Sequence, residues 1–240
     1  RRPRVGVIAT GSELVAPDRQ PAFGQIRNSN SFQLSALVAA ASAVPQNYGA
    51  VPDDKDVIQA TLCQAMAAND VVVLSGGISN GDYDLVRAVL EESAVELLFD
   101  RVGPAPENRD APYFPPPISP ENRVRPYLSA PGRPVVLGVS DRAFCFGLSG
   151  NPVSSFVAFE LLVKPFLYAL AGHRFQPATF RGELARTVQR RKARKDLWLP
   201  VVVAEDGRVH PVEGQGRTGL HDFCPAHGLI HVPAGTAGFT

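Results

Sequence analysis

Short runs of consecutive apolar residues alternate with segments whose apolar residues recur every three or four positions. The runs at 4–9 and 71–74 are typical of strands buried on both faces of a parallel sheet, and the segments 44–51 and 95–102 are also predicted to be strands. The periodic segments at 31–42, 53–68 and 83–92 indicate amphipathic helices. Strand and helix alternate at the spacing of right-handed βαβ units. The pattern therefore predicts a three-layer α/β domain, in which a parallel or mixed sheet carries helices on both faces.

Helix starts and one hairpin refine this picture. The runs at 135–139 and 143–148 flank Ser140-Asp141-Arg142 and predict a β-hairpin. A long apolar helix is expected at 156–171, introduced by Asn151 as N-cap and Pro152 at the first helical position. Two earlier helices each have two candidate N-caps, namely Asn28 or Ser29 and then Asp53 or Asp54.

The pattern changes twice in the second half of the chain. Prolines crowd the stretch from Gly103 to Pro134, which excludes a regular helix or a central strand there. We expect a surface insertion, with a partner-binding proline-rich segment as the alternative. Beyond Gly172, short apolar runs at 180–187, 197–204, 209–212 and 229–232 predict a small all-β domain. The expected domains are thus 1–174, with the insertion at about 103–132, and a C-terminal β-barrel at 175–240.

Composition narrows the class of protein. Lys plus Arg number 24 against 23 Asp plus Glu, so no global field attracts nucleic acid or an anionic membrane. The basic run 186–195 is expected to be a solvated hairpin, the alternative being a nucleic-acid contact. The apolar pattern predicts no stretch of membrane-spanning length and no signal peptide, so we expect a cytoplasmic protein. Three widely spaced cysteines suit reduced thiols. The chain enters strand-like sequence directly at Arg1, which suggests a piece of something longer.

Three predicted strands end in small polar residues that precede a helix or an acid. They are Thr10-Gly11-Ser12-Glu13-Leu14, Ser75-Gly76-Gly77 and Ser149-Gly150-Asn151-Pro152-Val153-Ser154-Ser155. Glycine lets backbone N–H groups approach an oxyanion, and a helix start adds its positive dipole end and free N–H groups. Ligands of open α/β sheets bind at the carboxyl edge of the strands. These stretches therefore predict a phosphate or oxyanion site at one edge of the sheet.

Ordered motifs give the chain a specific resemblance. They are Thr10–Leu14, Gly24-Gln25-Ile26-Arg27-Asn28-Ser29-Asn30, Ser75–Ser79 with Gly81 and Asp84, Pro131-Gly132-Arg133-Pro134, Gly150–Ser154, and Gly214-Gln215-Gly216 with Gly228–Ile230 and Pro233. With them the chain resembles the molybdopterin molybdenumtransferase family, which includes the gephyrin E region. The resemblance implies transfer of molybdate onto an adenylylated molybdopterin, use of Mg²⁺, a homodimer, further N-terminal domains and the C-terminal barrel.

The resemblance also implies roles for single residues. Asp84 would hold Mg²⁺, with Asp82 as the neighbouring candidate, although both acids could simply favour a helix N-terminus. Arg133 would bind molybdate or phosphate, and Ser154 would donate its hydroxyl. The catalytic candidates are therefore Asp84, Arg133 and Ser154. The binding candidates are Thr10, Gly11, Ser12, Glu13, Ser75, Gly76, Gly77, Ser79, Gly81, Gly150, Asn151 and Pro152, of which Asn151 and Pro152 also have a purely structural reading.

Three positions depart from the family pattern, and alternatives follow from them. Ala130 stands where the family usually has lysine, Ser12 where it often has aspartate, and Ser149 where it has proline. A pterin adenylyltransferase or another nucleotide-handling enzyme of the same superfamily is one alternative function. A pterin-binding or scaffold module without turnover is the other. The spacing of His221, Cys224, His227 and His231 is also compatible with zinc, but a barrel segment without metal explains it better.

Overall fold

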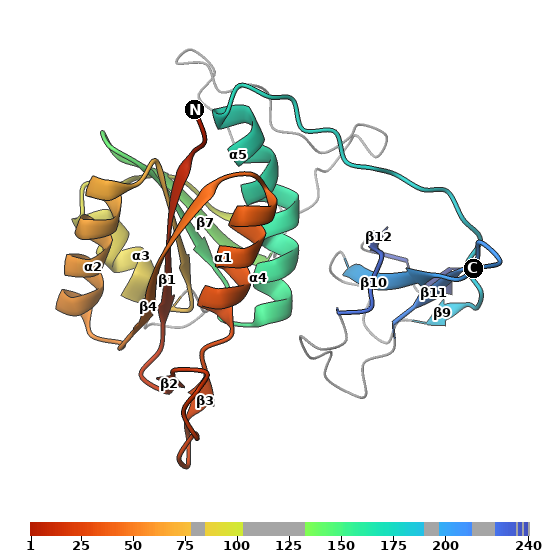
Figure 1. The fold of residues 1–240 in the computed structure, drawn as a ribbon, viewed down its shortest axis with the longest axis horizontal. Coiled ribbons are helices and arrows are strands. Elements are labelled where there is room, and N and C mark those ends of the chain that lie inside the picture. Colours follow the sequence, from red (N-terminus) through yellow and green to blue (C-terminus); the bar gives the residue numbers. More distant parts are fainter. Residues whose placement is uncertain are drawn as a thin grey trace. The chain divides into compact units, whose positions relative to one another are not determined.

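The chain folds around a six-stranded sheet with the strand order β4-β1-β5-β8-β7-β6 (Figure 1). The structure is a computed structural model and describes residues 1–77, 85–102, 133–189, 197–212, 224–233, 235–236 and 238–239. β1 (Arg4–Thr10), β4 (Val44–Val51), β5 (Val71–Ser75) and β8 (Phe144–Leu148) run parallel. β7 (Arg133–Val139) is antiparallel to both β8 and β6 (Glu96–Val102), so the sheet is mixed and the expected hairpin is confirmed.

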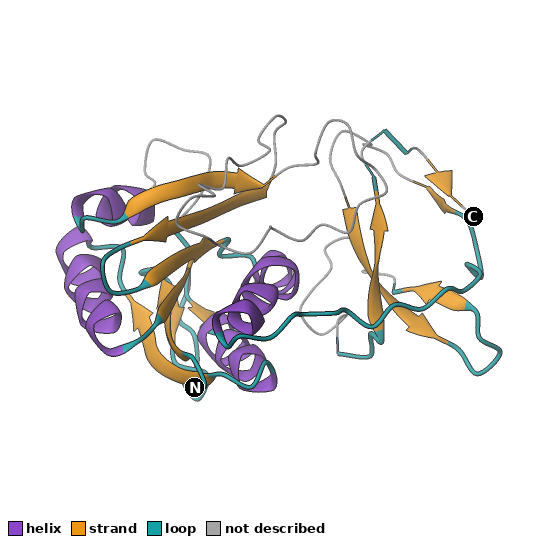
Figure 2. Ribbon diagram, turned by 90° about the horizontal axis from the view of Figure 1, so that it is seen from above, coloured by secondary structure: helices purple, strands orange, loops and turns teal. Residues whose placement is uncertain are grey.

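Helices cover both faces of this sheet (Figure 2). On one face lie α1 (Asn30–Ala40) and the helical run α4 (Pro152–Ala158), η1 (Phe159–Val163) and α5 (Lys164–Leu170); on the other lie α2 (Lys55–Ala68) and α3 (Leu85–Glu92). Central strand β5 serves both faces, because side chains alternate along a strand. Val71 and Val73 pack with the α1 side, whereas Val72 and Leu74 pack with the α2 side. The fully buried, unalternating apolar run of β5 is thereby explained, and the three-layer prediction is confirmed.

The long apolar helix expected at 156–171 is interrupted by a π-helical turn. η1 ends at Val163, two residues before Pro165, which is in the first turn of α5. Proline has no N–H and its ring crowds the carbonyl four residues earlier, so the wider π turn accommodates it. By length and apolar composition, Pro152–Leu170 could span a membrane, which corrects the expectation that no such stretch exists. Its residues Phe159, Val163 and Leu167 are buried in the core against the sheet, whereas 39% of an 18-residue window of this stretch is buried as a whole.

A short arm follows β1 and was not predicted from the sequence. Within it, β2 (Leu14–Val15) pairs in parallel with β3 (Ile26–Arg27) (Figure 1). Two residues per strand are too few to show a period, and so the pattern of apolar positions gives no signal here. Phe23 near the turn of the arm is fully exposed.

The described residues divide into two units, of which the first holds Arg1–Val102 and Arg133–Phe175 and the second begins at Gln176. In the second unit, β10 (Leu197–Val203) pairs antiparallel with β11 (Val209–Pro211) and with β12 (Gly228–Val232). β9 (Val188–Gln189) pairs with β13 (Gly238–Phe239). The prediction of a strand at 180–187 is wrong. The β pairing described in this segment is a single isolated bridge between Leu184 and Val209. Closure into a barrel stays a prediction.

The candidate N-caps are resolved by the hydrogen bonds at each helix start. Asp54 caps α2 by accepting from the N–H groups of Asp56 and Val57. At α1, Ser29 occupies the N-cap position without a side-chain bond, and Asn28 Oδ1 instead accepts from Ser31 N–H at 3.1 Å. The proline-rich insertion at 103–132 lies outside the described residues, as does most of the basic run 186–195.

Candidate functional site

The three adjacent parallel strands β1, β5 and β8 end at the same edge of the sheet. Their last residues are Thr10, Ser75 and Leu148, and the loop that follows each strand is tied to a neighbouring strand. Gly76 N–H donates to the Leu148 carbonyl at 3.0 Å, and Gly11 N–H donates to the Val51 carbonyl at 3.0 Å. The loops predicted to bind an oxyanion are thus neighbours at this edge.

Gly76 and Gly77 are required by the geometry of the β5 loop. Both have positive φ, +103° and +65°, a region that L side chains rarely adopt. A β-carbon on Gly76 would lie 2.4 Å from the Thr10 carbonyl oxygen, and one on Gly77 would lie 2.7 Å from Val86 Cγ2. The backbone of this loop is therefore packed directly against the end of β1, with no room for side chains.

Asn30 joins two of these loops, and the sequence analysis did not include it among the site residues. It is 9% exposed and opens α1. Its Nδ2 donates to Ser75 Oγ at 2.6 Å and to the Gly150 carbonyl at 2.8 Å. Ser75 Oγ in turn contacts the Ser149 carbonyl at 3.4 Å. A signal was available in the sequence, because Asn30 lies four and eight residues before the buried Leu34 and Val38 and so shares their core-facing side.

The start of α4 is capped rather than open. Asn151 Oδ1 accepts from Val153 N–H at 3.0 Å and from Ser154 N–H at 3.1 Å. The expectation that this turn presents free N–H groups is therefore wrong for these two amides, since the N-cap side chain already uses them. The cap itself, and Pro152 in the first helical turn, are confirmed. Ser155 Oγ donates back to the Pro152 carbonyl at 3.0 Å, which leaves the half-buried Ser154 as the hydroxyl that can serve a ligand.

Two of the residues that depart from the family pattern, Ser12 and Ser149, make hydrogen bonds within the loops of the site. Ser12 and Asp53 bond reciprocally: Ser12 N–H donates to Asp53 Oδ2 at 3.1 Å, and Asp53 N–H donates to Ser12 Oγ at 2.9 Å. Ser149 Oγ accepts from Asn151 N–H at 3.2 Å and so supports the turn before α4. Glu13 is exposed, and its carboxylate lies beside Gly11.

Several predicted site residues fall outside the described part of the chain: Ser79, Gly81, Asp82 and Asp84, together with the side chain of Arg133, whose backbone opens β7. Among the described residues, no group of three His, Cys, Asp or Glu side chains is placed to hold a metal ion. Of the zinc candidates, His227 Nδ1 accepts from Val203 N–H at 3.1 Å, and His231 stacks on Trp198 with ring centroids 4.6 Å apart. These two rings are thus engaged within the second unit's sheet.

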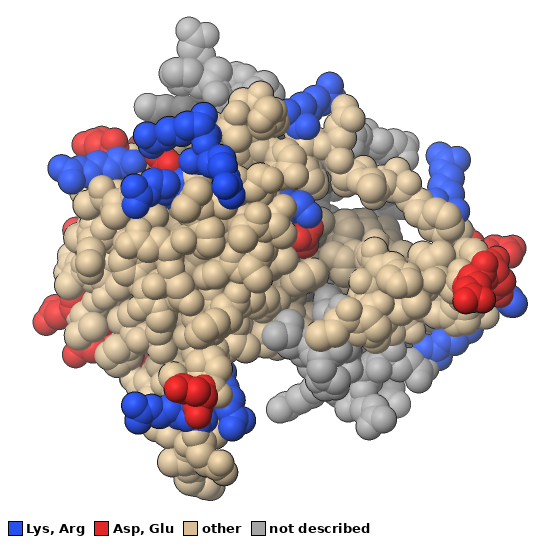
Figure 3. Space-filling model, in the orientation of Figure 1, with Lys and Arg blue, Asp and Glu red and all other residues tan. Residues whose placement is uncertain are grey.

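Side chains of both signs surround a broad uncharged area over α1 and α4 on the visible face. Figure 3 shows several basic side chains gathered at the upper left, with acidic side chains beside them. This distribution agrees with the balanced composition and gives no support to a nucleic-acid surface on that face.

Comparison with known proteins agrees with this arrangement. A molybdopterin molybdenumtransferase from Bacillus subtilis is 32% identical to this chain, and the match covers the whole chain and 50% of the relative's length. A molybdopterin molybdenumtransferase from Staphylococcus epidermidis is 26% identical, and the match covers the whole chain and 52% of the relative's length. A molybdopterin biosynthesis MoeA protein from Pyrococcus horikoshii superposes with a TM-score of 0.75 at 28% identity, covering 99% of this chain and 52% of that one. A molybdenum cofactor biosynthesis protein from Pyrococcus furiosus gives 0.62 at 25% identity, covering 100% and 64%. The chain spans about half the length of the curated relatives it matches.

The family model described as a probable molybdopterin binding domain matches residues 6–169, a range that contains every loop of the site. That range runs from β1 into α5 and so covers the whole sheet and both helical layers. The chain therefore belongs to the family of probable molybdopterin binding domains.

Proposed function

We propose that this chain is the part of a molybdopterin molybdenumtransferase that binds the pterin phosphate and inserts molybdate during molybdenum cofactor biosynthesis. The observation that carries the proposal is the contact of the Gly76 backbone with both Thr10 and Gly150 at the carboxyl edge of the sheet. A phosphate and molybdate are both oxyanions, and backbone N–H groups that side chains do not screen bind both. The N–H groups of Gly76 and Gly11 already donate to the carbonyls of Leu148 and Val51, so the donors in this proposal are the N–H groups of Gly77 and Gly150. Relatives that carry this activity in their names match the chain from end to end.

The binding and catalytic roles follow the three loops. The phosphate would lie against the loop of Gly76 and Gly77 and the adjacent loop of Thr10, Gly11, Ser12 and Glu13. The Ser154 hydroxyl would donate a hydrogen bond to molybdate. Arg133 would neutralise the oxyanion as a bidentate donor, because a guanidinium matches the spacing of two oxygens. With the family lysine replaced by Ala130, Arg133 is the principal cation in this proposal.

The proposal also includes Mg²⁺ and an adenylylated form of the substrate, and both of these are inferred from the resemblance to the family. The described residues alone do not provide a carboxylate set for Mg²⁺. The ion would therefore depend on Asp84, with Asp82 as the neighbouring candidate. Ser79 and Gly81, in the same segment, would bind the phosphate or oxyanion. When bound it would neutralise charge on the phosphate and molybdate oxygens. A homodimer is likewise proposed from the resemblance. A cytoplasmic location is proposed from the three widely spaced cysteines, which suit reduced thiols.

Two measurements test this function. The intact protein should bind molybdopterin by calorimetry, and with molybdate and Mg²⁺ it should produce cofactor that reactivates an apo-molybdoenzyme. Arg133→Ala should lower reactivation at least about tenfold by removing a charge-assisted contact. The matched control is Arg142→Ala, since Arg142 is exposed in the hairpin turn at the amino-terminal end of β8.

The outcomes separate the alternatives. Binding with turnover supports the transferase. Binding without turnover replaces it with a pterin-binding scaffold, and AMP transfer onto molybdopterin from ATP replaces it with an adenylyltransferase. Absence of both binding and turnover in the intact protein would falsify the proposal.

A further inference from the structure

Two buried asparagines in the first unit make nearly the same hydrogen bonds at opposite ends of β5. Asn30 donates from Nδ2 to a hydroxyl, Ser75 Oγ, and to a backbone carbonyl, that of Gly150. Asn69, 6% exposed, donates from Nδ2 to a hydroxyl, Tyr48 Oη at 3.1 Å, and to the Ala65 carbonyl at 2.9 Å. In both residues Oδ1 is buried and has no partner. Asn69 joins elements away from the binding edge, whereas Asn30 joins two loops of the site.

The orientation of the Asn30 amide is fixed by its neighbours. A backbone carbonyl only accepts hydrogen bonds, so the group 2.8 Å from the Gly150 oxygen is the NH₂ and the unpartnered atom is Oδ1. A buried acceptor without a partner costs stability. The two hydrogen bonds of Asn30 reach residues that are 45 and 120 positions away in the sequence, Ser75 and Gly150. No local turn therefore explains why a buried asparagine stands here.

A second α1 side chain acts on the same loop. Gln33 Nε2 donates to the Pro152 carbonyl at 3.2 Å, and its buried Oε1 also has no partner. The base of α1 is in turn fixed by Asn28 and Ser31, which bond to each other through Asn28 Nδ2 and Ser31 Oγ at 2.8 Å. The start of α1 is therefore a rigid support from which two amides hold the carbonyls of Gly150 and Pro152.

We propose that Asn30 is a positioning residue for the binding site: its amide holds the β5 loop against the loop before α4, so that Gly76 and Gly150 present their backbones to one ligand. Gln33 assists by holding the far end of the same α4 loop. Without Asn30, the loops after β5 and β8 keep the Gly76 N–H bond to the Leu148 carbonyl and the longer contact of Ser75 Oγ with the Ser149 carbonyl, but they lose the side chain that holds the Gly150 carbonyl. The anion would then meet a more mobile loop at Gly150, and the ordering of this loop on binding would weaken affinity.

The test compares Asn30→Ala with Asn69→Ala in the intact protein by amide hydrogen exchange, without any ligand. Both variants lose a similar set of bonds, so similar loss of global stability is expected. Asn30→Ala alone should speed exchange at least about tenfold at Gly76 and at 150–155, where the N–H groups of Gly76, Asn151 and Ser155 are hydrogen-bonded. Unchanged exchange at these amides, or equal acceleration by Asn69→Ala, overturns the proposal.

A second arm measures molybdopterin binding and rests on the proposed function. Asn30→Ala and Asn30→Asp should each raise the dissociation constant at least about tenfold, while Asn69→Ala should leave it within about twofold. Asp keeps the shape of Asn but faces the Gly150 carbonyl with an oxygen, so normal binding by Asn30→Asp would show that filling space is enough and would overturn the positioning role. If the unmodified protein does not bind molybdopterin, the proposed function fails, and hydrogen exchange still decides the role of Asn30.

Discussion

Gly150 lies directly on Gly76: a β-carbon built on Gly150 would come 3.4 Å from Gly76 Cα. The two residues follow adjacent parallel strands, and their contact brings the β5 loop and the α4 loop together backbone to backbone. The pair is unequal, however. Gly76 has a positive φ of +103° and faces the Thr10 carbonyl, whereas Gly150 has ordinary van der Waals room.

This inequality predicts opposite outcomes for the same substitution. Gly76→Ala combines backbone strain with a clash against main-chain atoms that cannot move aside, and should cost at least about 3 kcal/mol of unfolding free energy. Gly150→Ala should cost less than about 1 kcal/mol, because 3.4 Å is an ordinary contact. Urea denaturation followed by circular dichroism measures both. Equal losses in the two variants would contradict the geometry of this junction.

The two best-defined helix caps allow the site to be separated from stability. Asn151 in α4 and Asp54 in α2 each accept from the N–H groups two and three residues later. Asn151→Ala and Asp54→Ala should therefore each cost about 1 kcal/mol by chemical denaturation. Asn151→Ala should change molybdopterin affinity in calorimetry more than Asp54→Ala. Asn151 lies in a loop of the site, whereas Asp54 is connected to the site only through its neighbour Asp53, which bonds to Ser12. If both variants changed affinity alike, the α4 start would have no special part in binding.

The sheet and its helices could be predicted because each central strand is buried on both faces and each helix has one apolar side. β5 and α2 show this most clearly, and β4 was predicted to the residue. The β2–β3 arm and the π turn at Phe159–Val163 could not be predicted in this way. The arm is too short to show a period, and the π turn depends on how the chain accommodates Pro165 within an otherwise apolar helix.

The loops of the site were found through their glycines, but the way they are held together was not. Glycine and small polar residues mark a strand end in the sequence, whereas Asn30 acts on Gly150 across 120 positions of sequence. A hydrogen bond of that range leaves no local pattern. The free N–H groups expected at α4 were wrong for a related reason: the N-cap residue that identifies the helix start also satisfies its first amides.

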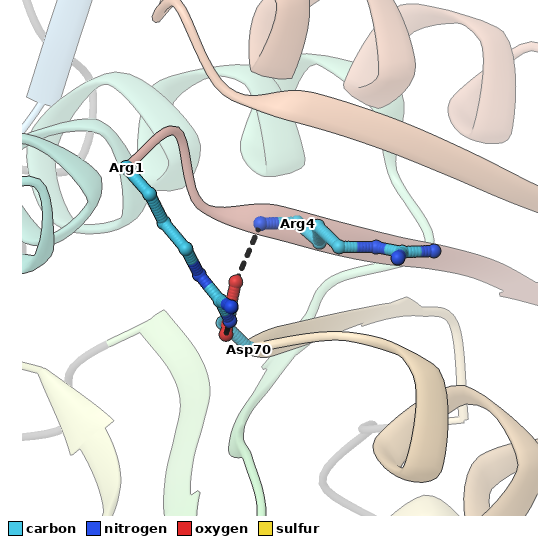
Figure 4. A network of polar contacts seen from close by, with 3 residues as sticks. All are labelled: Arg1, Arg4 and Asp70. Carbon is cyan, nitrogen blue, oxygen red and sulfur yellow. Dashed lines mark hydrogen bonds and ion pairs between the residues drawn. The ribbon is translucent and has the colours of Figure 1, made fainter.

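Asp70 joins the starts of β1 and β5 (Figure 4). Its Oδ2 accepts from Arg4 N–H at 2.8 Å, and its Oδ1 pairs with Arg1 Nη2 at 2.5 Å. Burial raises the pKa of this carboxyl, but the Arg4 N–H bond and the Arg1 guanidinium together bring the pKa below its ordinary value. Ionised Asp70 therefore stabilises the fold above its unfolded-state pKa near 4, and this contribution is lost as the pH falls through the lower folded-state pKa.

Asp70→Asn should accordingly lower the unfolding free energy by up to about 1 kcal/mol at pH 7, a limit set by the partial exposure of the pair. The difference from the unmodified protein should shrink toward zero as the pH is lowered to about 2.5. Urea titrations at a series of pH values measure it. A difference that stays constant from pH 7 to pH 2.5 would show that ionisation of Asp70 is not what stabilises this corner.

Cys145 gives the opposite pH dependence. It is fully buried in β8 between the sheet and the α2 side, and burial raises the pKa of its thiol from 9.0 to about 12. Above pH 9 the unfolded chain releases this proton while the folded chain keeps it, so the stability contribution present below pH 9 is lost as the pH rises toward 12. Between pH 9 and pH 10.5 the unfolding free energy should fall by about 1–2 kcal/mol more in the unmodified protein than in Cys145→Ala. Cys63→Ala is the control, since Cys63 is exposed on α2.

Iodoacetamide at pH 8 should label Cys63 and not Cys145 in the folded protein. Labelling of Cys145 at the rate of Cys63 would mean that β8 opens readily, and the core position of this strand would then have to be abandoned.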